Sequence, residues 1–468
     1  MFAHIIAVTQ PPARFAFSLQ ILTLVTVVVL IFLFSISAVP IGYNLRNLTV
    51  RWKTTIMTAL AFTAVVGLLT VMLAFVEGMA RLTEGSGHPE NVIMLSQGTT
   101  DETFSNLSFS DSGDLENQPG IGRSKQVSTN GVPKPLCSCE TYLVLVQPVQ
   151  VMIPGRPERR FTQIRGIEDP LVAAEVHGLA LFPGGEWFSQ AGVEELPADA
   201  QTGQSGLPAL QVVIGEGIAK ELGKDRPAAE LAKAKNPERI DVGETFPLGN
   251  RIAIVKGIMK SSRSTFGSEI WGKRSVVGPL FGKNVYTSIV ARTDSPEAAE
   301  KLADFLNNQY KKAAIQAQVE TAYFASLSET NKQFTIAISF VAVVMAIGGV
   351  FGVMNTMFAA VSQRIKDIGV LRLLGFARWQ ILVSFLLESL VIALIGGILG
   401  AALGSLTDGW TANSIVAGQG GGKLIILELI VGPNTIAVGL LLALAMGLIG
   451  GLVPSLTAMR LRALEALR

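Results

Sequence analysis

The sequence predicts an α-helical integral membrane protein with five transmembrane helices and a large inserted extracytoplasmic α/β domain. The 468 residues are 49% hydrophobic and only 16% charged, whereas soluble domains carry about 25% charged residues. The apolar residues gather in five runs near the two ends of the chain, and each run meets the roughly 20 residues that a helix needs to cross a bilayer. Residues 81–332, between these groups, have the mixed composition of a soluble domain.

The five runs occupy residues 15–39, 54–76, 334–361, 381–407 and 435–459. Only the fourth run contains a charged residue, Glu388. The first run is longer than the apolar core of a secretory signal peptide, its basic flank follows it, and no small-residue cleavage site is evident. We therefore expect a retained membrane helix there in preference to a cleaved signal peptide.

The basic residues predict the orientation of these helices, because short cytoplasmic loops are rich in Lys and Arg. The connections with such an excess contain Arg46, Arg51 and Lys53, then Arg364, Lys366, Arg372 and Arg378, and finally Arg460, Arg462 and Arg468. Alternating crossings then place residues 81–332 outside and the C-terminus inside. We expect a multi-pass protein of the inner (cytoplasmic) membrane, embedded in the lipid bilayer. The net charge of +2 gives no reason to expect a nucleic-acid partner.

Four domains are expected along the chain. Residues 1–42 form an additional N-terminal transmembrane helix, 43–80 a cytoplasmic amphipathic segment with the first core transmembrane helix, 81–332 the inserted domain, and 333–468 three transmembrane helices with a cytoplasmic tail. In the inserted domain, 81–130 has loop composition, while 142–151, 211–214, 251–258, 286–291 and 314–320 predict strands. Ser295 followed by Pro296 predicts a helix start. Residues 321–363 contain no proline, which favours a helix continuous into the membrane.

No motif for nucleotide binding or covalent catalysis is evident in the sequence. The glycine-rich stretch 418–424 has the wrong spacing for a phosphate-binding loop and lacks its Ser or Thr, so we expect a flexible loop there. No serine lies in a G-x-S-x-G nucleophile elbow. We therefore expect no catalytic residue and no cofactor, and the chain is not expected to be an enzyme.

The residues that commonly bind metals are too scattered to predict a metal site. His4, His88 and His177 share no ligand spacing. Cys137 and Cys139 form a single C-x-C without a second ligand pair. Two free thiols or an unusual local bridge are the alternatives for these cysteines.

Glu388 lies inside an apolar run, where a carboxylate costs roughly 2.5–3.5 kcal/mol on insertion scales. It follows Arg378 by about three helical turns, so we expect it to pair with a basic residue of the cytoplasmic connection. The alternative is a proton-relay carboxylate of a secondary transporter. In the same run, Gly396-Gly397, Gly400 and Gly404 form a face for close helix packing. The glycines of the fifth run, Gly439, Gly447, Gly450 and Gly451, make it the expected partner.

Three stretches, in order, resemble the FtsX/MacB type of ABC transporter permease. The first is Y-N-L-R-N-L and R-W-K-T within residues 43–54. The second runs from G-V-M-N-T-M at 352 through R-I-K-D-I-G-V-L-R-L-L-G at 364–375 to Glu388 and the following glycines. The third comprises Pro454, Ala458 and R-L-R-A-L-E-A-L-R at 460–468. In the inserted domain, V-I-G at 213–215 and V-G-E-T-F at 242–246 resemble the MacB-like periplasmic core.

The resemblance implies a permease subunit that dimerises, as a homodimer or a paralogous heterodimer, and binds a separate cytosolic ABC ATPase. It implies mechanotransmission, in which ATP-driven closure moves the extracytoplasmic domain, for export or extraction of a drug, peptide or lipoprotein. A periplasmic adaptor protein is a further expected partner. The alternative is an FtsX-like regulator that activates cell-wall hydrolases in division. The size of the 81–332 domain favours export.

The connection between the third and fourth runs is the most basic one and is expected to contact the ATPase. Ile365, Ile368 and Leu371 fall on one face of a short helix, and Gly375 suits its left-handed C-terminal cap. We expect this apolar face to dock in a groove of the ATPase. The expected coupling residues are Arg364, Ile365, Lys366, Ile368, Leu371, Arg372 and Gly375.

Overall fold

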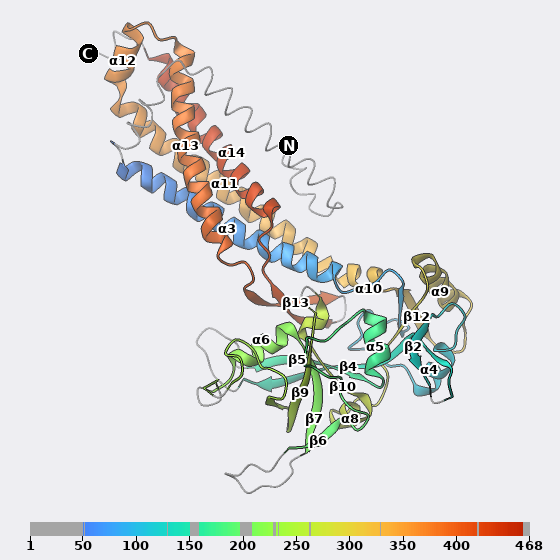
Figure 1. Cartoon of the computed structure of the whole chain (residues 1–468). Coiled ribbons are helices and arrows are strands. Elements are labelled where there is room, and N and C mark those ends of the chain that lie inside the picture. Colours follow the sequence, from blue (N-terminus) through green and yellow to red (C-terminus); the bar gives the residue numbers. More distant parts are fainter. Residues whose placement is uncertain are drawn as a thin grey trace. The chain divides into compact units, whose positions relative to one another are not determined.

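The computed structural model describes residues 50, 52–128, 130–149, 159–196, 208–227, 231–232, 234–261, 264–327, 329–418 and 421–461. The chain divides into two compact units (Figure 1). The helical unit comprises Met1–Gly78, Lys332–Trp410 and Glu428–Arg468, and the sheet unit comprises Met79–Asn331 and Thr411–Leu427. The first expected span, residues 15–39, and the last residues of the tail, 462–468, lie outside the described residues.

Four long helices build the helical unit and run side by side in Figure 1. They are α3 (Trp52–Glu84), α11 (Glu329–Gln363), α13 (Arg378–Ser405) and α14 (Pro433–Arg460), with the short α12 (Ile365–Leu373) between α11 and α13 in the chain. By length and composition, Trp52–Leu82, Gln333–Gln363, Arg378–Ser405 and Pro433–Arg460 can each cross a membrane. These four segments coincide with the second to fifth apolar runs.

Glycines let α13 approach α3 closely. A Cβ atom added to Gly396 would lie 2.5 Å from the carbonyl oxygen of Ala59, and one added to Gly400 would lie 2.7 Å from that of Thr63. Thr63 Oγ1 also donates a hydrogen bond to the carbonyl oxygen of Gly396, at 3.2 Å. Close backbone approach through small residues is the usual packing mode of helices in lipid.

The expected packing of α13 against the fifth run is also found, because a Cβ added to Gly397 would lie 3.0 Å from the Cβ of Ala443 in α14, whereas Gly396 and Gly400 face α3. Helix α14 packs on a different side of α13, where a Cβ added to Gly447 would lie 2.7 Å from the Cβ of Ala393. Glycines spaced by four residues predict a close contact, but they do not identify the helix that makes it.

A mixed ten-stranded sheet forms the centre of the sheet unit. Its order is β12 (Ile315–Val319), β1 (Asn91–Ser96), β11 (Ser288–Arg292), β4 (Cys137–Pro148), β5 (Arg159–Ile167), β10 (Glu269–Lys273), β7 (Pro208–Gly215), β9 (Arg251–Met259) and β8 (Thr245–Leu248), with β6 (Val193–Glu195) paired to β7. The pairs β5–β10 and β7–β9 are parallel, and the other pairs are antiparallel. A separate two-stranded sheet joins β2 (Arg123–Val127) and β3 (Pro133–Pro135).

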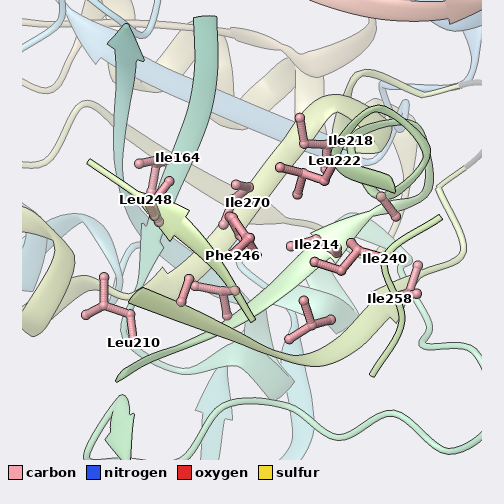
Figure 2. Packing of buried hydrophobic residues seen from close by; sticks show 14 of the residues in the cluster. Ile164, Leu210, Ile214, Ile218, Leu222, Ile240, Phe246, Leu248, Ile258 and Ile270 are labelled. Atoms are coloured by element: carbon pink, nitrogen blue, oxygen red, sulfur yellow. The ribbon is translucent and has the colours of Figure 1, made fainter. Parts of the chain in front are cut away.

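Short helices accompany this sheet and complete its apolar cores. They are α4 (Phe109–Leu115), α5 (Pro170–His177), α6 (Glu216–Lys224), α8 (Arg274–Leu280), α9 (Pro296–Asn308) and α10 (Glu320–Leu327), with a 3-10 turn at Thr265–Ser268. Figure 2 shows Ile218 and Leu222 of α6 in the same cluster as Ile214 of β7 and Ile258 of β9. A second core lies between α9 and the strands β1, β11 and β12.

The predicted start of α9 is confirmed. Pro296 is its first residue, and the Ser295 hydroxyl accepts a hydrogen bond from the Ala298 N–H at 3.2 Å. The expected strands at 142–151, 211–214, 251–258, 286–291 and 314–320 correspond to β4, β7, β9, β11 and β12.

Two loop predictions are wrong. The stretch 81–130 contains β1, whose residues from Asn91 to Leu95 are buried within the sheet, because a short apolar run is hidden there between Ser- and Gly-rich flanks. Of the glycine-rich stretch 418–424, Gly418 ends β13 (Thr411–Gly418) and residues 421–424 begin its partner strand β14 (Gly421–Glu428). Ile426 of β14 packs in the first core, and its N–H donates a hydrogen bond to Ser268 Oγ at 2.8 Å. Residues 419–420 lie outside the described residues.

The expected helix across residues 321–363 is described as α10 and α11, and Ser328 between them lies outside the described residues. Helix α11 begins within the residues of the sheet unit and continues into those of the helical unit. Its candidate span starts at Gln333.

Candidate functional site

Helix α12 ends in a fixed turn, which makes the connection from α11 to α13 a defined structure. Gly375 adopts φ 92°, a left-handed conformation that is favourable for glycine. The Phe376 N–H donates to the Leu371 carbonyl oxygen at 3.2 Å, and the Gly375 N–H donates to that of Arg372 at 3.3 Å. This pair of hydrogen bonds is the Schellman motif. The predicted C-terminal cap at Gly375 is confirmed.

The same turn leads directly into α13. Arg372 Nη1 donates a hydrogen bond to the Phe376 carbonyl oxygen at 3.1 Å. The Ala377 N–H donates to Oε1 of Gln380 at 2.7 Å, which satisfies an amide at the start of α13. The turn is therefore held by side chains at both of its ends.

Arg364 and Glu388 form a buried ion pair at the other end of α12. Arg364 Nη1 lies 2.7 Å from Glu388 Oε2, and Nη2 lies 2.9 Å from Oε1. Both residues are 4% exposed, and the guanidinium also lies 5.7 Å from the ring centre of Phe385. Bidentate Arg–carboxylate pairs are among the strongest charge-assisted hydrogen bonds. Glu388 thus pairs with a basic residue of the connection, and Arg364 is that residue.

The apolar face predicted to dock on a partner is turned inward. Ile368 is 2% exposed and belongs to the same apolar cluster as Val361, Ile381 and Phe385. Ile365 and Leu371 are half-buried. Helical spacing identifies an apolar face, but a face of this kind can pack on its own protein as well as on a partner. The expectation that Ile368 docks outside the chain is therefore corrected.

The described residues present a different apolar surface on this connection. Val370, Leu373 and Leu374 are 47%, 63% and 71% exposed. Lys366 and Asp367 are also exposed. We call these five residues the α12 surface. Arg364, one of the expected coupling residues, is instead buried with Glu388.

The two cysteines lie on strand β4 as free thiols. Cys139 Sγ donates a hydrogen bond to Glu116 Oε1 at 3.0 Å. Hydrogen bonding with Cys137, together with burial, raises the pKa of the Cys139 thiol well above its usual value, which disfavours the reactive thiolate. Among the described residues, no group of three or more His, Cys, Asp or Glu side chains is placed to hold a metal ion.

A second stretch with glycine–lysine spacing is Gly267-S-E-I-W-Gly272-Lys273. It carries Arg274 where a phosphate-binding loop needs Ser or Thr. Residues 269–273 form the buried strand β10, so this segment is not a phosphate-binding loop.

The sequence reading missed a buried ionic cluster in the sheet unit. Its members are Glu102, Glu140, Arg165, His177, Glu269 and Glu320, and each is at most 3% exposed. No local pattern relates these residues, because they come from six separate segments of the chain. The only local sign is Arg165, a charged residue in the strand sequence T-Q-I-R-G-I.

Two family profiles match the chain. The FtsX-like permease C-terminal profile matches residues 339–463, and the MacB-like periplasmic core domain profile matches residues 55–309. The second match includes residues 81–140.

Curated proteins of similar sequence are also found. "Macrolide export ATP-binding/permease protein MacB" of Shigella boydii is 29% identical over 241 residues, which are 49% of this chain and 36% of that protein. The protein of the same name in Escherichia coli K12 is 28% identical over 241 residues, again 49% of this chain and 36% of that protein. The chain thus covers about a third of the length of these relatives, 36%.

Two solved structures match part of the chain. The periplasmic region of MacB from Actinobacillus actinomycetemcomitans matches 53% of this chain and 95% of that structure, with 15% identity and a TM-score of 0.32. The extracellular domain of the transporter YknZ from Gram-positive bacteria matches 49% of this chain and 99% of that structure, with 14% identity and a TM-score of 0.30.

Proposed function

Because the chain belongs to the MacB-like and FtsX-like family of ABC transporter permeases, we propose that it couples ATP hydrolysis on a separate cytosolic ATPase to movement of its extracytoplasmic domain. The proposed moving part is the sheet unit. The proposed point of contact with the ATPase is the α12 surface.

The α12 surface carries this proposal, because it combines exposed apolar side chains with a rigid support. Leu373 and Leu374 stand at the C-terminal end of α12, next to the Schellman turn at Gly375. Ile368 anchors the opposite side of α12 in the apolar cluster, and the Arg364–Glu388 pair fixes its first turn to α13. A force applied to α12 is therefore passed to α13 without first deforming a flexible loop.

We propose that ATP hydrolysis takes place on another subunit, for a chemical reason. The 468 residues contain no G-x-x-x-x-G-K-[ST] loop, whose amides and hydroxyl hold phosphate and Mg²⁺. The curated relatives carry both "ATP-binding" and "permease" in their name, and the aligned part is 36% of their length. We propose a cytosolic ABC ATPase as the partner that supplies the missing part.

The proposed transport is export or extraction of a drug, peptide or lipoprotein. The name of the curated relatives refers to macrolide export. The proposal for this chain is not limited to macrolides and includes drugs, peptides and lipoproteins as substrates. We also propose that two copies, or this chain and a paralogue, form the membrane part, and that a periplasmic adaptor binds the sheet unit.

The proposal is tested by reconstituting the chain in nanodiscs with the ABC ATPase that co-purifies with it. ATP hydrolysis is measured with and without the chain, and hydrogen exchange of the sheet unit is compared with ATP and with ADP. We expect the chain to change the hydrolysis rate and ATP to change exchange in the sheet unit. Hydrolysis by the chain alone, or transport driven by a proton gradient without an ATPase, contradicts the proposal.

A further inference from the structure

Arg165 is the centre of the buried ionic cluster and joins three carboxylates. Its Nε and Nη2 donate to the two carboxylate oxygens of Glu269, each at 2.7 Å. Its Nη1 donates to Glu102 Oε1 at 2.9 Å and to Glu140 Oε2. The guanidinium therefore ties strands β4, β5 and β10 to the segment that follows β1.

His177, the last residue of α5, extends the cluster towards α10. Its Nε2 lies 2.6 Å from Glu140 Oε1, and its Nδ1 lies 3.5 Å from Glu320 Oε1. The first distance is a hydrogen bond, and the second is an ion-pair separation. The rings of Phe266 and Trp271 pack against the imidazole, with centroid distances of 4.8 Å and 5.8 Å.

The charge of His177 follows from these contacts. Burial by itself lowers the pKa of His177, but Glu140 and Glu320 outweigh it and raise that pKa from 6.5 to about 9. The imidazole is therefore a cation at neutral pH, with each ring nitrogen facing a carboxylate. Loss of its proton would leave one ring N–H for two carboxylates.

Glu320 is the first residue of α10 and fixes this helix to the sheet. Its Oε2 accepts a hydrogen bond from the His88 N–H at 2.9 Å and another from Asn91 Nδ2 at 2.8 Å. Asn91 is the first residue of β1. A carboxylate at the N-terminus of a helix is further stabilised by the helix dipole. Both oxygens of Glu320 thus point to groups of the sheet unit outside α10.

The far end of α10 leads to the membrane segments. Helix α10 ends at Leu327, α11 begins at Glu329, and the candidate span follows at Gln333. The chain passes between the two units in α11, and also in α3 and on either side of residues 411–427. The attachment of α10 to the sheet is therefore one route by which a displacement of α11 could be passed on.

We propose that the His177–Glu320 contact is a force-bearing joint, which makes the sheet move with α10 when α11 moves. The joint rests on the proposed function, because it gives a route by which ATP-driven movement enters the sheet unit. Glu320 and His177 are positioning residues in this account and contact no substrate.

The joint is tested first in the full-length chain without any ATPase, by amide hydrogen exchange at pH 7. The variants are His177→Gln and Glu320→Gln, and the matched control is Glu194→Gln, whose carboxylate pairs with Lys256 at 2.9 Å in the same unit. We expect protection of α10 to fall by about tenfold in both variants, with β7 and β9 unchanged, because local openings are independent of the most stable elements. The control retains wild-type protection throughout.

The pH dependence separates a charged joint from ordinary packing. In the wild type, the protection factor of α10 relative to β9 is expected to fall between pH 8 and 10, as the His177 pKa of about 9 is crossed. In His177→Gln that fall is absent. The joint is overturned if α10 stays protected in both variants, if α10 and β9 lose protection together, or if wild type and His177→Gln share one pH profile.

The reconstituted complex then tests transmission. Wild-type sheet strands are expected to change their hydrogen exchange with ATP, and Glu320→Gln is expected to abolish that change while ATP hydrolysis continues. An ATP response in Glu320→Gln equal to that of the wild type overturns the joint alone. A wild type that shows no ATP response contradicts the proposed function and, with it, the role of the joint.

Discussion

Arg364 and Glu388 are joined by two parallel hydrogen bonds, at 2.7 Å and 2.9 Å, between the residue that precedes α12 and the middle of α13. Both side chains are 95% buried. The Glu388 carboxylate, which is unfavourable in an apolar helix on insertion scales, is thus hydrogen-bonded on both oxygens by the guanidinium of Arg364. This arrangement favours a structural or coupling role for Glu388 over a proton-relay role.

The ion pair predicts a characteristic mutational pattern. Glu388→Gln and Arg364→Met each leave one buried group without its partner, and each should destabilise the chain by about 3–5 kcal/mol. The double variant Arg364→Met with Glu388→Leu should regain most of that loss, because apolar replacement of a buried ion pair is often neutral. Thermal unfolding in detergent micelles measures all three. Wild-type stability of both single variants would show that the pair does not support the fold.

Ile368→Asp should destabilise the chain, because it places a charge in the apolar cluster beside Phe385. Val370→Asp, two residues away at a side chain that is 47% exposed, should leave the unfolding temperature within a few degrees of the wild type. The comparison uses one chemical change at neighbouring positions of one helix. Equal stability of the two variants would mean that Ile368 does not face the interior.

Gly400→Ala should separate α13 from α3, since the added Cβ would lie 2.7 Å from the Thr63 carbonyl oxygen and 2.9 Å from Val66 Cβ. Overpacking of this kind costs about 1–3 kcal/mol. The control is Gly352→Ala in α11, where no atom lies within 4 Å of the added Cβ and the helix gains roughly 1 kcal/mol from alanine. Thermal unfolding should therefore shift in opposite directions. A stabilising Gly400→Ala would contradict the close contact.

The sheet unit should be most stable between about pH 4.5 and 6.5. Glu140 and Glu320 raise the pKa of His177 from 6.5 to about 9, so its contribution is complete below pH 6.5 and is lost as the pH rises through 9. Burial raises the pKa of Glu140, but Arg165 and His177 outweigh it and lower that pKa from 4.5 to about 2. Its contribution is therefore present above pH 4.5 and is lost as the pH falls through 2.

This pH dependence is measured by thermal unfolding of the full-length chain, followed by the intrinsic fluorescence of its five tryptophans, of which Trp187 and Trp271 lie in the sheet unit. The His177 contribution is on the order of 3 kcal/mol. His177→Gln should be less stable than the wild type at pH 6 and should lose less stability between pH 7 and 10. Parallel profiles for the two proteins over that interval would exclude a cationic His177.

The sequence predicts those features that depend on residues close together in the chain. The apolar runs, the cap at Ser295 and the turn at Gly375 are local, and the structure has them where they are predicted. Contacts between residues distant in sequence cannot be predicted in this way. The need of Glu388 for a cation follows from its apolar surroundings, but the choice of Arg364 depends on how α12 folds back on α13. Arg165 has three carboxylate partners between residues 102 and 269, and no local pattern relates them.

The face of α12 illustrates the same limit. Ile368 and Leu371 are correctly predicted to share a helical face, but spacing does not reveal whether that face meets the chain's own bundle or another protein. Strand β1 was missed for the opposite reason, since its flanking residues are typical of loops although the strand itself is buried.

The central claim is that the α12 surface transmits the action of an ATPase, and stimulation of that ATPase by the reconstituted chain tests it most directly. The test variant is Leu373→Asp with Leu374→Asp, at side chains 63% and 71% exposed, and the control is Leu406→Asp, 68% exposed at the other end of α13. Because a few apolar anchors carry most of the binding energy at such contacts, we expect the double variant to lose stimulation by about tenfold or more. The control should stimulate like the wild type, and all three proteins should unfold at similar temperatures. Undiminished stimulation by a folded double variant would contradict the account.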